Sequence, residues 1–328
     1  MRNILKPVIY ALVFFAAFFT WSEEAEAGRY IRYSSYQGMR YVYLRDVGAY
    51  YGMKLQLGDK SCSIRSQAGN ASFTYNRREG SINGIKVSFM FSTVLSGSEP
   101  LISEYDFLLL VDPILRASAQ KHKIGVIIID PGHGGKDNGA QGRFYREKDI
   151  TLLIARRVKD ILRAKGYMAL LTRDKDVFLD LDTRPAKASA YKADLFVSVH
   201  CNSAGNGVSP VNGVETFCLT PEGAPSSSEA KARSNRKERG NAFNKNNILL
   251  AYCVQRGILR NTGANDRGIK EARFAVLKDA PCPAVLVEAG FLSNLTEERN
   301  LATSAYQDKI AFGIAEGIIA YHRAMVGK

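Results

Sequence analysis

Cysteine and histidine are scarce in this sequence, and their spacing excludes several kinds of site. The 328 residues include five cysteines, four histidines and one tryptophan. An odd number of cysteines cannot all pair, and no two of these have the C-x-x-C spacing of a structural zinc site. We therefore expect mostly buried, unpaired thiols, with one unassigned disulfide as the alternative, among Cys62, Cys201, Cys218, Cys253 and Cys282.

Several common functional motifs are also missing. The sequence contains neither G-x-G-x-x-G nor G-x-x-x-x-G-K-[ST], so nucleotide binding through such glycine-rich loops is not expected. It also lacks G-x-S-x-G and H-E-x-x-H, which removes support for serine hydrolases and thermolysin-like proteases. Glycine, proline and charged residues occur at ordinary frequencies, and this composition excludes collagen-like, coiled-coil and wholly disordered chains.

A continuous apolar run stands near the N-terminus. Arg2 and Lys6 precede the run over 8–21, and the small residues Ala25 and Ala27 follow where a signal peptidase would read them. Because the run is shorter than the roughly 20 residues that span a bilayer, a membrane anchor is the less favoured alternative. We predict a signal peptide over residues 1–27 and an exported chain without a stable membrane span. The periplasm is the expected compartment, with the cell wall or the extracellular space as alternatives.

Basic residues outnumber acidic ones, and the formal net charge is +13. Removing residues 1–27 takes away two basic and three acidic residues and raises the net charge to +14. An excess of positive charge favours an anionic partner. Because export separates the chain from nucleic acid, we expect anionic envelope polymers as partners and no nucleic acid.

Residues 28–119 combine short alternating patterns with glycine or asparagine turns, which is typical of a small β-rich α+β domain. The unit over 41–47, the turn over 81–84 and the unit over 101–115 resemble the small envelope domain named for the N-terminal domain of copper amine oxidases. This resemblance implies no copper and an accessory or targeting role. The predicted strands are Tyr41–Leu44, Ser61–Ile64, Ala71–Tyr75 and Ile85–Phe89, and the predicted helices are Arg45–Tyr51 and Asp112–Gln120.

Over residues 124–328, β-branched strands alternate with helical patterns, which is typical of an α/β domain. We predict an open, mostly parallel or mixed twisted sheet with helices on both faces. A polar insertion at about 221–262 includes a predicted helix over 248–259. The predicted strands are Val126–Ile129, Tyr167–Thr172, Leu195–Val199, Val214–Leu219 and Ala284–Val287, and the other predicted helices are Ile150–Ala164 and Ile310–Arg323.

Two histidines stand where predicted strands end, at the edge where open α/β sheets gather ligand and catalytic residues. They are His133, in the loop Asp130-Pro131-Gly132-His133-Gly134-Gly135, and His200. A single histidine at such a position more often completes a hydrogen-bond network than binds a metal ion. Glu147 stands at a predicted helix start, where a negative charge interacts favourably with the helix dipole even without a metal ion. Glu288 ends an apolar strand, where a carboxylate needs a partner, a solvated cleft or a metal ion. Two histidines and one glutamate are the ligands of a catalytic zinc ion, and a second carboxylate can take a proton from water.

These residues fall within a series of motifs that covers nearly all of residues 124–328. In chain order its members are Ile127–Ala140, Glu147–Asp149, Leu171–Asp174, Leu181–Arg184, Ala193–Asn202, Gly213–Thr216, Arg267–Lys270 and Val287–Asn294. This series resembles the zinc-dependent N-acetylmuramoyl-L-alanine amidases, which cleave peptidoglycan.

The resemblance implies a role for each candidate residue. His133, Glu147 and His200 would hold one zinc ion. Glu288 would act as general base and then donate a proton to the leaving amine. The bond cleaved would be the amide between N-acetylmuramic acid and L-alanine. The alternatives are a zinc carboxypeptidase acting on the stem peptide and a catalytically inactive wall-binding protein.

Four further motif positions have more than one interpretation. Arg184 and Asn202 would make either a salt bridge and a strand-end hydrogen bond or contacts to substrate. Cys201 replaces the family's usual small residue, and we expect it to face the core because adjacent strand residues point to opposite faces. Its alternative role is a fourth, inhibitory metal ligand. Asn138 stands where proline is usual, with little expected consequence for metal binding.

The insertion at about 221–262 is longer than a compact amidase needs. Its basic run over 231–239 is either a solvated surface or a binding site for the anionic wall. Some members of the family carry an inhibitory helix here, whose carboxylate occupies the zinc, and an activator protein would act on that helix. Glu222, Glu229 and Glu238 are the candidates for such a carboxylate.

Overall fold

The computed structural model describes residues 30–117, 124–205, 207–228 and 233–327. The predicted signal peptide and Glu229 lie outside these residues. None of the described helices is both long and apolar enough to cross a membrane.

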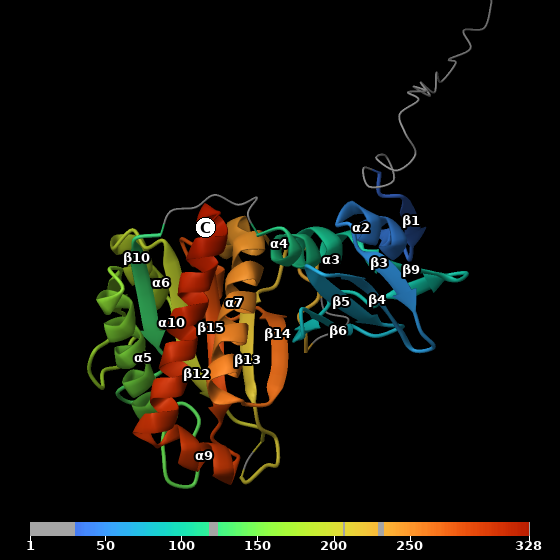
Figure 1. The fold of residues 1–328 in the computed structure, drawn as a ribbon. Helices are drawn as coiled ribbons and strands as arrows, with labels where there is room; N and C mark the ends of the chain where they lie inside the picture. Colours follow the sequence, from blue (N-terminus) through green and yellow to red (C-terminus); the bar gives the residue numbers. More distant parts are fainter. Residues whose placement is uncertain (1–29, 118–123, 206, 229–232, 328) are drawn as a thin grey trace, which may run out of the picture.

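The N-terminal region folds into short antiparallel strands with a small helical segment (Figure 1). The four predicted strands and the first predicted helix of this region are present. The second predicted helix begins at Asp112 as expected and ends at Leu115, and residues 118–120 of the prediction lie outside the described residues. A π-helix over Phe107–Val111, which was not predicted, precedes it. The elements are β1 Tyr33–Tyr36, β2 Met39–Tyr43, α2 Leu44–Tyr50, β3 Lys54–Leu57, β4 Ser61–Ser66, β5 Gly69–Thr74, β6 Glu79–Ile82, β7 Ile85–Ser88, β8 Val94–Ser96, β9 Glu99–Ser103, α3 Glu104–Asp106, η1 Phe107–Val111 and α4 Asp112–Leu115.

The C-terminal region has the predicted α/β order, with every predicted strand and helix present. Its long helix α5 is amphipathic: Ile150, Ile154, Val158 and Leu162, spaced by four residues, are buried. The elements are β10 Val126–Pro131, α5 Glu147–Ala164, β11 Met168–Leu171, α6 Thr183–Ala190, β12 Leu195–Asn202, β13 Val214–Leu219, η3 Arg239–Phe243, α7 Asn244–Thr262, β14 Asp266–Ala272, α8 Ala275–Lys278, β15 Ala284–Phe291, α9 Leu295–Leu301 and α10 Ser304–Val326.

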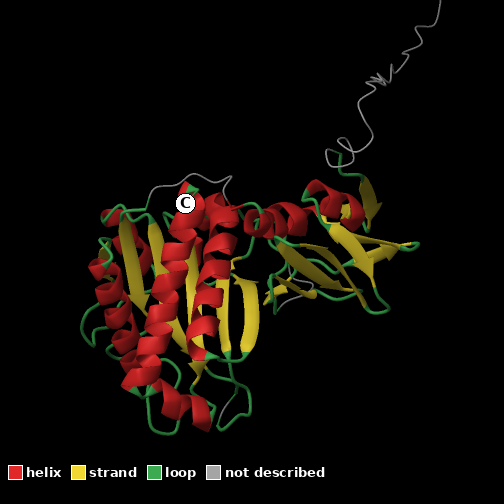
Figure 2. Ribbon diagram, in the orientation of Figure 1, coloured by secondary structure: helices red, strands yellow, loops and turns green. Residues whose placement is uncertain are grey.

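The central sheet is mixed and open, as predicted. Strands β11, β10, β12 and β15 are parallel neighbours, whereas β13 pairs antiparallel with β15 and parallel with β14. Helices α5, α7 and α10 cover one face of the sheet (Figures 1 and 2). Buried residues of α8 and α6, including Leu277 and Ala188, pack against Phe196 and Leu286 on the other face. Helices therefore lie on both faces.

The two short helices α6 and α8 cover only part of their face. Along β12 and β15 the side chains on this face are first apolar, at Phe196 and Leu286, and then polar, at His200 and Glu288. His200 and Glu288 are partly exposed. The uncovered part of this face, at the C-terminal ends of the parallel strands, therefore offers polar groups to a ligand.

The larger sheet runs through both regions of the chain. Its order is β11-β10-β12-β15-β13-β14-β7-β6-β5-β4-β3, and β7 joins β14 through the parallel pair Val87–Ile269. The backbone N–H of Lys86 also donates to Asp266 (2.8 Å). The smaller sheet, β1-β2-β9-β8, belongs to the N-terminal region alone. The predicted division at residues 119–124 stays a prediction, but the two parts share one sheet.

The insertion packs against the N-terminal region. Because β13 is antiparallel to β15, the chain leaves β13 at the edge of the sheet where β15 begins. Arg78 donates to the backbone carbonyl of Ser226 (3.1 Å), and the Arg233 guanidinium lies 4.9 Å from the centre of the Phe91 ring. The later part of the insertion forms α7, which confirms the predicted helix, and α7 packs along α10.

Glu271 of β14 is a buried carboxyl group at the junction of the two regions. Ser227 Oγ lies 3.4 Å from its Oε2, whereas its Oε1 has no hydrogen-bond partner among the described residues. Burial, together with the nearby Asp106 carboxylate, raises the pKa of Glu271 from 4.5 to about 8. Between these two pH values the folded chain keeps a proton that the unfolded chain has lost, so the free energy of unfolding falls as the pH rises.

We expect Glu271→Gln to remove this pH dependence, because glutamine has the shape of the protonated carboxyl group and cannot ionise. The variant should match the parent chain at pH 4.5 and unfold with a free energy a few kcal/mol higher at pH 8. Urea denaturation of both proteins at the two pH values measures this difference. The exposed Glu222→Gln is the control and should shift stability at neither pH; an equal shift at both pH values for Glu271→Gln would contradict the assignment.

Candidate metal centre and active site

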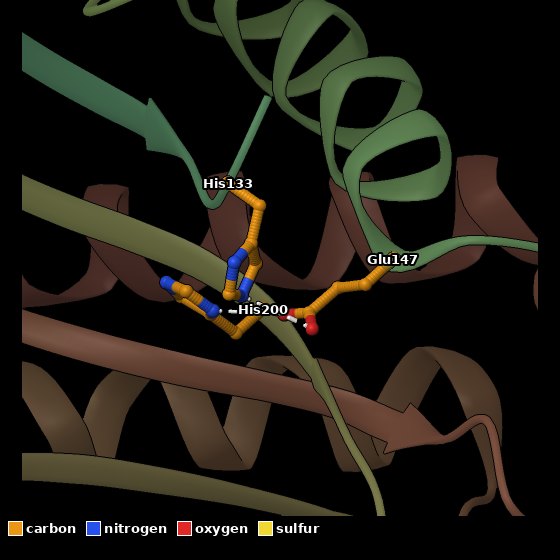
Figure 3. Close-up of side chains that lie close together, drawn as sticks. All are labelled: His133, Glu147 and His200. Atoms are coloured by element: carbon orange, nitrogen blue, oxygen red, sulfur yellow. Dashed lines mark hydrogen bonds and ion pairs between the residues drawn. The ribbon is translucent and has the colours of Figure 1, made fainter. Parts of the chain in front are cut away.

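The structure brings His133, Glu147 and His200 together at the C-terminal edge of the parallel strands (Figure 3). His133 Nε2 lies 3.1 Å from Glu147 Oε2, and His200 Nδ1 lies 2.8 Å from Glu147 Oε1. One candidate ligand atom from each residue lies within 4.8 Å of the other two. Two imidazole nitrogens and one carboxylate oxygen in this arrangement fit a divalent metal ion of the zinc type.

The loop after β10 carries His133 and depends on glycine for its close packing. His133 itself has a φ of 60°, a left-handed conformation that is uncommon for residues with a side chain. A Cβ added at Gly132 would lie 2.4 Å from the His200 ring, and one added at Gly139 would lie 2.5 Å from Glu147 Oε2. Glycine at these two positions therefore lets the backbone approach the three candidate ligands.

Two residues without a predicted role hold this loop in place. Asp137 Oδ2 lies 2.7 Å from His133 Nδ1, so the other ring nitrogen, Nε2, is turned to Glu147. A carboxylate bound to the far nitrogen in this way fixes the orientation of a metal-binding histidine. Arg173 is buried and donates to the backbone carbonyls of Pro131 (3.0 Å) and Gly132 (2.7 Å).

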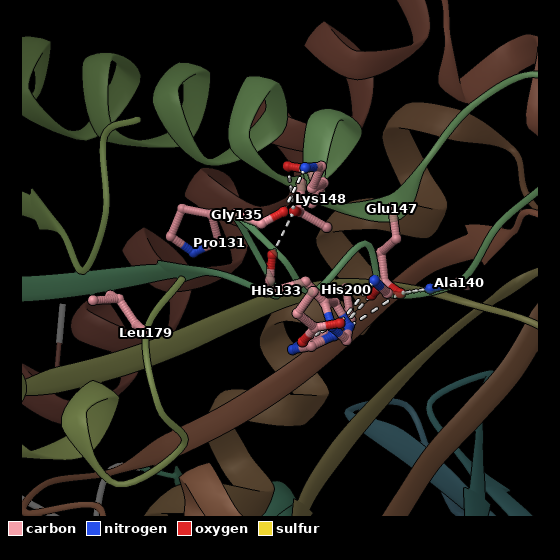
Figure 4. A network of polar contacts seen from close by, with 12 residues as sticks. Pro131, His133, Gly135, Ala140, Glu147, Lys148, Leu179 and His200 are labelled. Carbon is pink, nitrogen blue, oxygen red and sulfur yellow. Dashed lines mark hydrogen bonds and ion pairs between the residues drawn. The ribbon is translucent and has the colours of Figure 1, made fainter. Parts of the chain in front are cut away.

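Glu147, the first residue of α5, is buried between the two histidines. The backbone N–H of Ala140 donates to its Oε2 (2.7 Å; Figure 4), and the backbone N–H of Cys201 donates to its Oε1 (3.0 Å). Burial opposes ionisation of this carboxyl group, but the hydrogen bonds from His133 and His200 outweigh burial and lower its pKa. The group is therefore ionised at neutral pH, as a metal ligand must be.

Glu288 lies beside the cluster without belonging to it. In the pairing of β12 with β15 it stands directly opposite His200. Its Oε2 is shielded from solvent and has no hydrogen-bond partner in the described part of the chain. Burial and the neighbouring carboxylates of Glu147 and Glu215 raise the pKa of Glu288 well above its usual value. An unpaired carboxylate next to a metal site has the position of a proton acceptor.

Arg184 makes the expected salt bridge, with Asp130, and it also holds the loop that carries His133. Its guanidinium donates to Asp130 Oδ1 (2.9 Å) and to the backbone carbonyl of His133 (2.9 Å). Asp130 is fully buried and also accepts hydrogen bonds from Thr172 (2.5 Å) and Ser198 (2.7 Å). Because the Arg184 side chain is only 3% exposed, it positions the His133 loop and does not reach substrate.

Asn202 and Cys201, two of the other three motif positions, have structural roles. Asn202 donates from Nδ2 to Glu215 Oε1 (2.7 Å), which is the strand-end hydrogen bond that we expected. Cys201 is buried in the core on the opposite face of β12 from His200, as predicted, and it is not a candidate ligand. All five cysteines are buried and unpaired.

The described carboxylates of the insertion do not occupy the cluster. Glu238 caps helix η3 and pairs with Arg236 (3.2 Å). Glu222 follows β13 at the edge where β15 begins, whereas Glu288 and the cluster lie towards the end of β15. The hypothesis that Glu222 or Glu238 blocks the metal site is therefore wrong for this structure, because the antiparallel direction of β13 carries the insertion away from it. Glu229 lies outside the described residues.

Together, the α/β sheet, the His-Glu-His cluster at its C-terminal edge and the adjacent carboxylate of Glu288 form a candidate site of the metallohydrolase type. Comparison with known families assigns the chain to one family of hydrolases. Residues 127–320 match the family model described as N-acetylmuramoyl-L-alanine amidase. The chain belongs to this family.

Several relatives bear this name. The chain is 35% identical to the amidase LytC of Bacillus subtilis, in an alignment that covers 71% of this chain and 41% of LytC. It is 38% identical to the amidase AmiA of Escherichia coli, in an alignment that covers 60% of this chain and 75% of AmiA. It therefore spans less than half of LytC. Its fold is similar to the catalytic domain of CwlV from Bacillus (Paenibacillus) polymyxa, with a TM-score of 0.51, 35% identity, and coverage of 60% of this chain and 98% of that domain. It is equally similar (TM-score 0.51, 30% identity, the same coverage) to CwlD of Clostridioides difficile in complex with the GerS lipoprotein.

Proposed function

We propose that this chain hydrolyses the amide bond between N-acetylmuramic acid and L-alanine in peptidoglycan. The observation that carries the proposal is the cluster of His133, Glu147 and His200 beside the unpaired Glu288, within the segment that matches the amidase family. We propose one zinc ion as the metal, because two histidines and one carboxylate leave a fourth position for water or substrate. A zinc ion held there would supply Lewis acidity towards the scissile carbonyl and towards water.

The side chains around the cluster have separable tasks in this reaction. Glu288 accepts a proton from the attacking water as the water oxygen bonds to the carbonyl carbon. It then returns this proton to the amine nitrogen of L-alanine as the carbon–nitrogen bond breaks. Asp137 keeps the ring of His133 oriented throughout. The products are a free muramic acid carboxyl group and a stem peptide with a new N-terminal amine.

The remaining parts of the chain support this reaction in our proposal. Residues 1–27 direct export, with the periplasm as the favoured compartment. Residues 28–119 form an accessory module, which the shared sheet and the docked insertion hold beside the catalytic part, residues 124–328. The excess of basic residues favours contact with the anionic wall. An activator protein acting on residues 221–262 remains a proposal, and the CwlD–GerS complex gives a precedent for a partner within the family.

Mass spectrometry of peptidoglycan sacculi digested with the purified chain tests the proposed bond. We expect free stem peptides that begin with L-alanine, no product from chelator-treated protein, and recovery of product when Zn²⁺ is returned. Loss of a terminal D-alanine alone would indicate the zinc carboxypeptidase alternative. Sedimentation of the zinc-loaded chain with sacculi, without any released product, would indicate an inactive wall-binding protein.

A further inference from the structure

A row of polar side chains crosses the sheet from the candidate metal centre to β14. His200 stands opposite Glu288 in the pairing of β12 with β15, and Glu288 stands opposite Glu215 in the pairing of β15 with β13. Directly opposed residues of neighbouring strands point to the same face of a sheet. His200, Glu288 and Glu215 therefore line the same uncovered face, on the three neighbouring strands β12, β15 and β13.

Two cations from β14 meet the far end of this row. Arg267 Nε lies 3.0 Å and Lys270 Nζ lies 2.5 Å from the same oxygen, Oε2, of Glu215, while Asn202 donates to Oε1. The Glu215 side chain is 3% exposed, whereas those of Arg267 and Lys270 are 31% and 24% exposed. The two partly exposed cations therefore share one buried carboxylate, which is their only ion-pair partner among the described residues, while the Glu288 and Glu297 carboxylates act on Lys270 and Arg267 from further away.

On the opposite side of the cluster, the charged side chains are acidic instead of basic. A cavity of about 600 Å³ beyond His133 is lined by Asp137, Asp180 and Asp182 together with apolar residues, among them Phe178 and Leu181. Three carboxylates repel an anion but accept hydrogen bonds from hydroxyl groups, and apolar side chains can pack on the faces of sugar rings. The two sides of the site therefore differ in the charge that they accept.

We propose that Arg267 and Lys270 bind a free carboxylate of the stem peptide, and that the cavity beyond His133 receives the uncharged glycan. The inference rests on the proposed function. Strand β14 lies two strands from β15, about 10 Å away at the usual spacing between strands. An extended peptide advances about 3.3–3.6 Å per residue. The carboxylate that reaches Arg267 and Lys270 is therefore carried by one of the first few residues after the scissile amide.

Two synthetic muramoyl peptides test this proposal. They are identical except that the second residue of the peptide carries either a free carboxylate or a carboxamide. We expect the parent chain to have a kcat/KM about 10- to 100-fold higher for the carboxylate, the usual effect of a charge-assisted hydrogen bond. Lys270→Gln should bring this ratio close to one, mainly by raising KM for the carboxylate peptide. Arg267→Gln is a second variant that tests the same site independently.

The alternative is that the two cations only neutralise Glu215. In that case Lys270→Gln would lower activity on both peptides equally, and an unchanged ratio would overturn the proposal, as would a parent chain that does not discriminate. Lys136→Gln is the matched control: it removes a lysine from the loop on the other side of the cluster, near Phe178, and should leave the ratio unchanged. Isothermal titration calorimetry of both peptides with the Glu288→Gln variant measures the ratio of their binding constants and needs no turnover. Failure of the proposed hydrolysis is thereby distinguished from failure of carboxylate recognition.

Discussion

Glu288→Gln is expected to lower kcat/KM for muramoyl peptides by about a hundred- to ten-thousandfold, the usual contribution of a positioned general base. Glutamine keeps the volume of the side chain but cannot accept the proton of the attacking water. Because Glu288 is not one of the three clustered ligand residues, the variant should bind Zn²⁺ with the same stoichiometry and should remain folded. Steady-state kinetics and metal analysis on the same preparations measure both quantities.

Glu215→Gln gives the matched comparison, because Glu215 is the carboxylate directly across the sheet from Glu288. Its two oxygens are engaged by Asn202, Arg267 and Lys270, so it is not free to accept a proton. We expect this substitution to affect mainly KM. If Glu215→Gln removed kcat while Glu288→Gln retained it, Glu215 and not Glu288 would be the base.

The candidate ligands could be predicted because the signal is local. His133 and His200 follow apolar strands, and parallel strands bring their C-terminal ends to one edge of the sheet. Glu147 begins a helix that the apolar spacing of α5 makes evident. The role of Asp137 was not predicted, since it depends on the turn that folds the loop back on His133.

The row from His200 to Lys270 could not be derived from sequence. It requires the antiparallel pairing of β13 with β15, which places Glu215 opposite Glu288 across 73 positions of the chain. No sequence pattern indicated β14 either: its side chains are mostly charged, because several of them serve the site or the junction of the two regions instead of an apolar core. The same antiparallel pairing explains why the insertion lies away from the metal centre.

Arg184→Met is expected to destabilise the fold by about 3–5 kcal/mol, the usual cost of leaving a buried charge without its partner. Asp130 is fully buried, and after the substitution only Thr172 and Ser198 would still donate to it. The carbonyl of His133 would also lose its hydrogen bond from Arg184, and only the contacts of Asp137 and Arg173 would still hold the loop. Zn²⁺ affinity should therefore fall together with stability, even though Arg184 contacts only the backbone of His133 and none of the candidate ligand atoms.

A double substitution separates these two effects of Arg184. Asp130→Asn combined with Arg184→Met removes both charges, so it should be more stable than Arg184→Met alone, whereas independent sites would add their costs. Zn²⁺ affinity should stay low in the double variant, because the bond to the His133 carbonyl is still missing. The exposed pair Arg146–Asp149 is the control, and Arg146→Met should cost less than about 1 kcal/mol. Urea denaturation with chelator present and zinc titration measure the two quantities. An Arg184→Met chain as stable as the Arg146→Met control, with unchanged zinc affinity, would show that the buried pair does not position the metal centre.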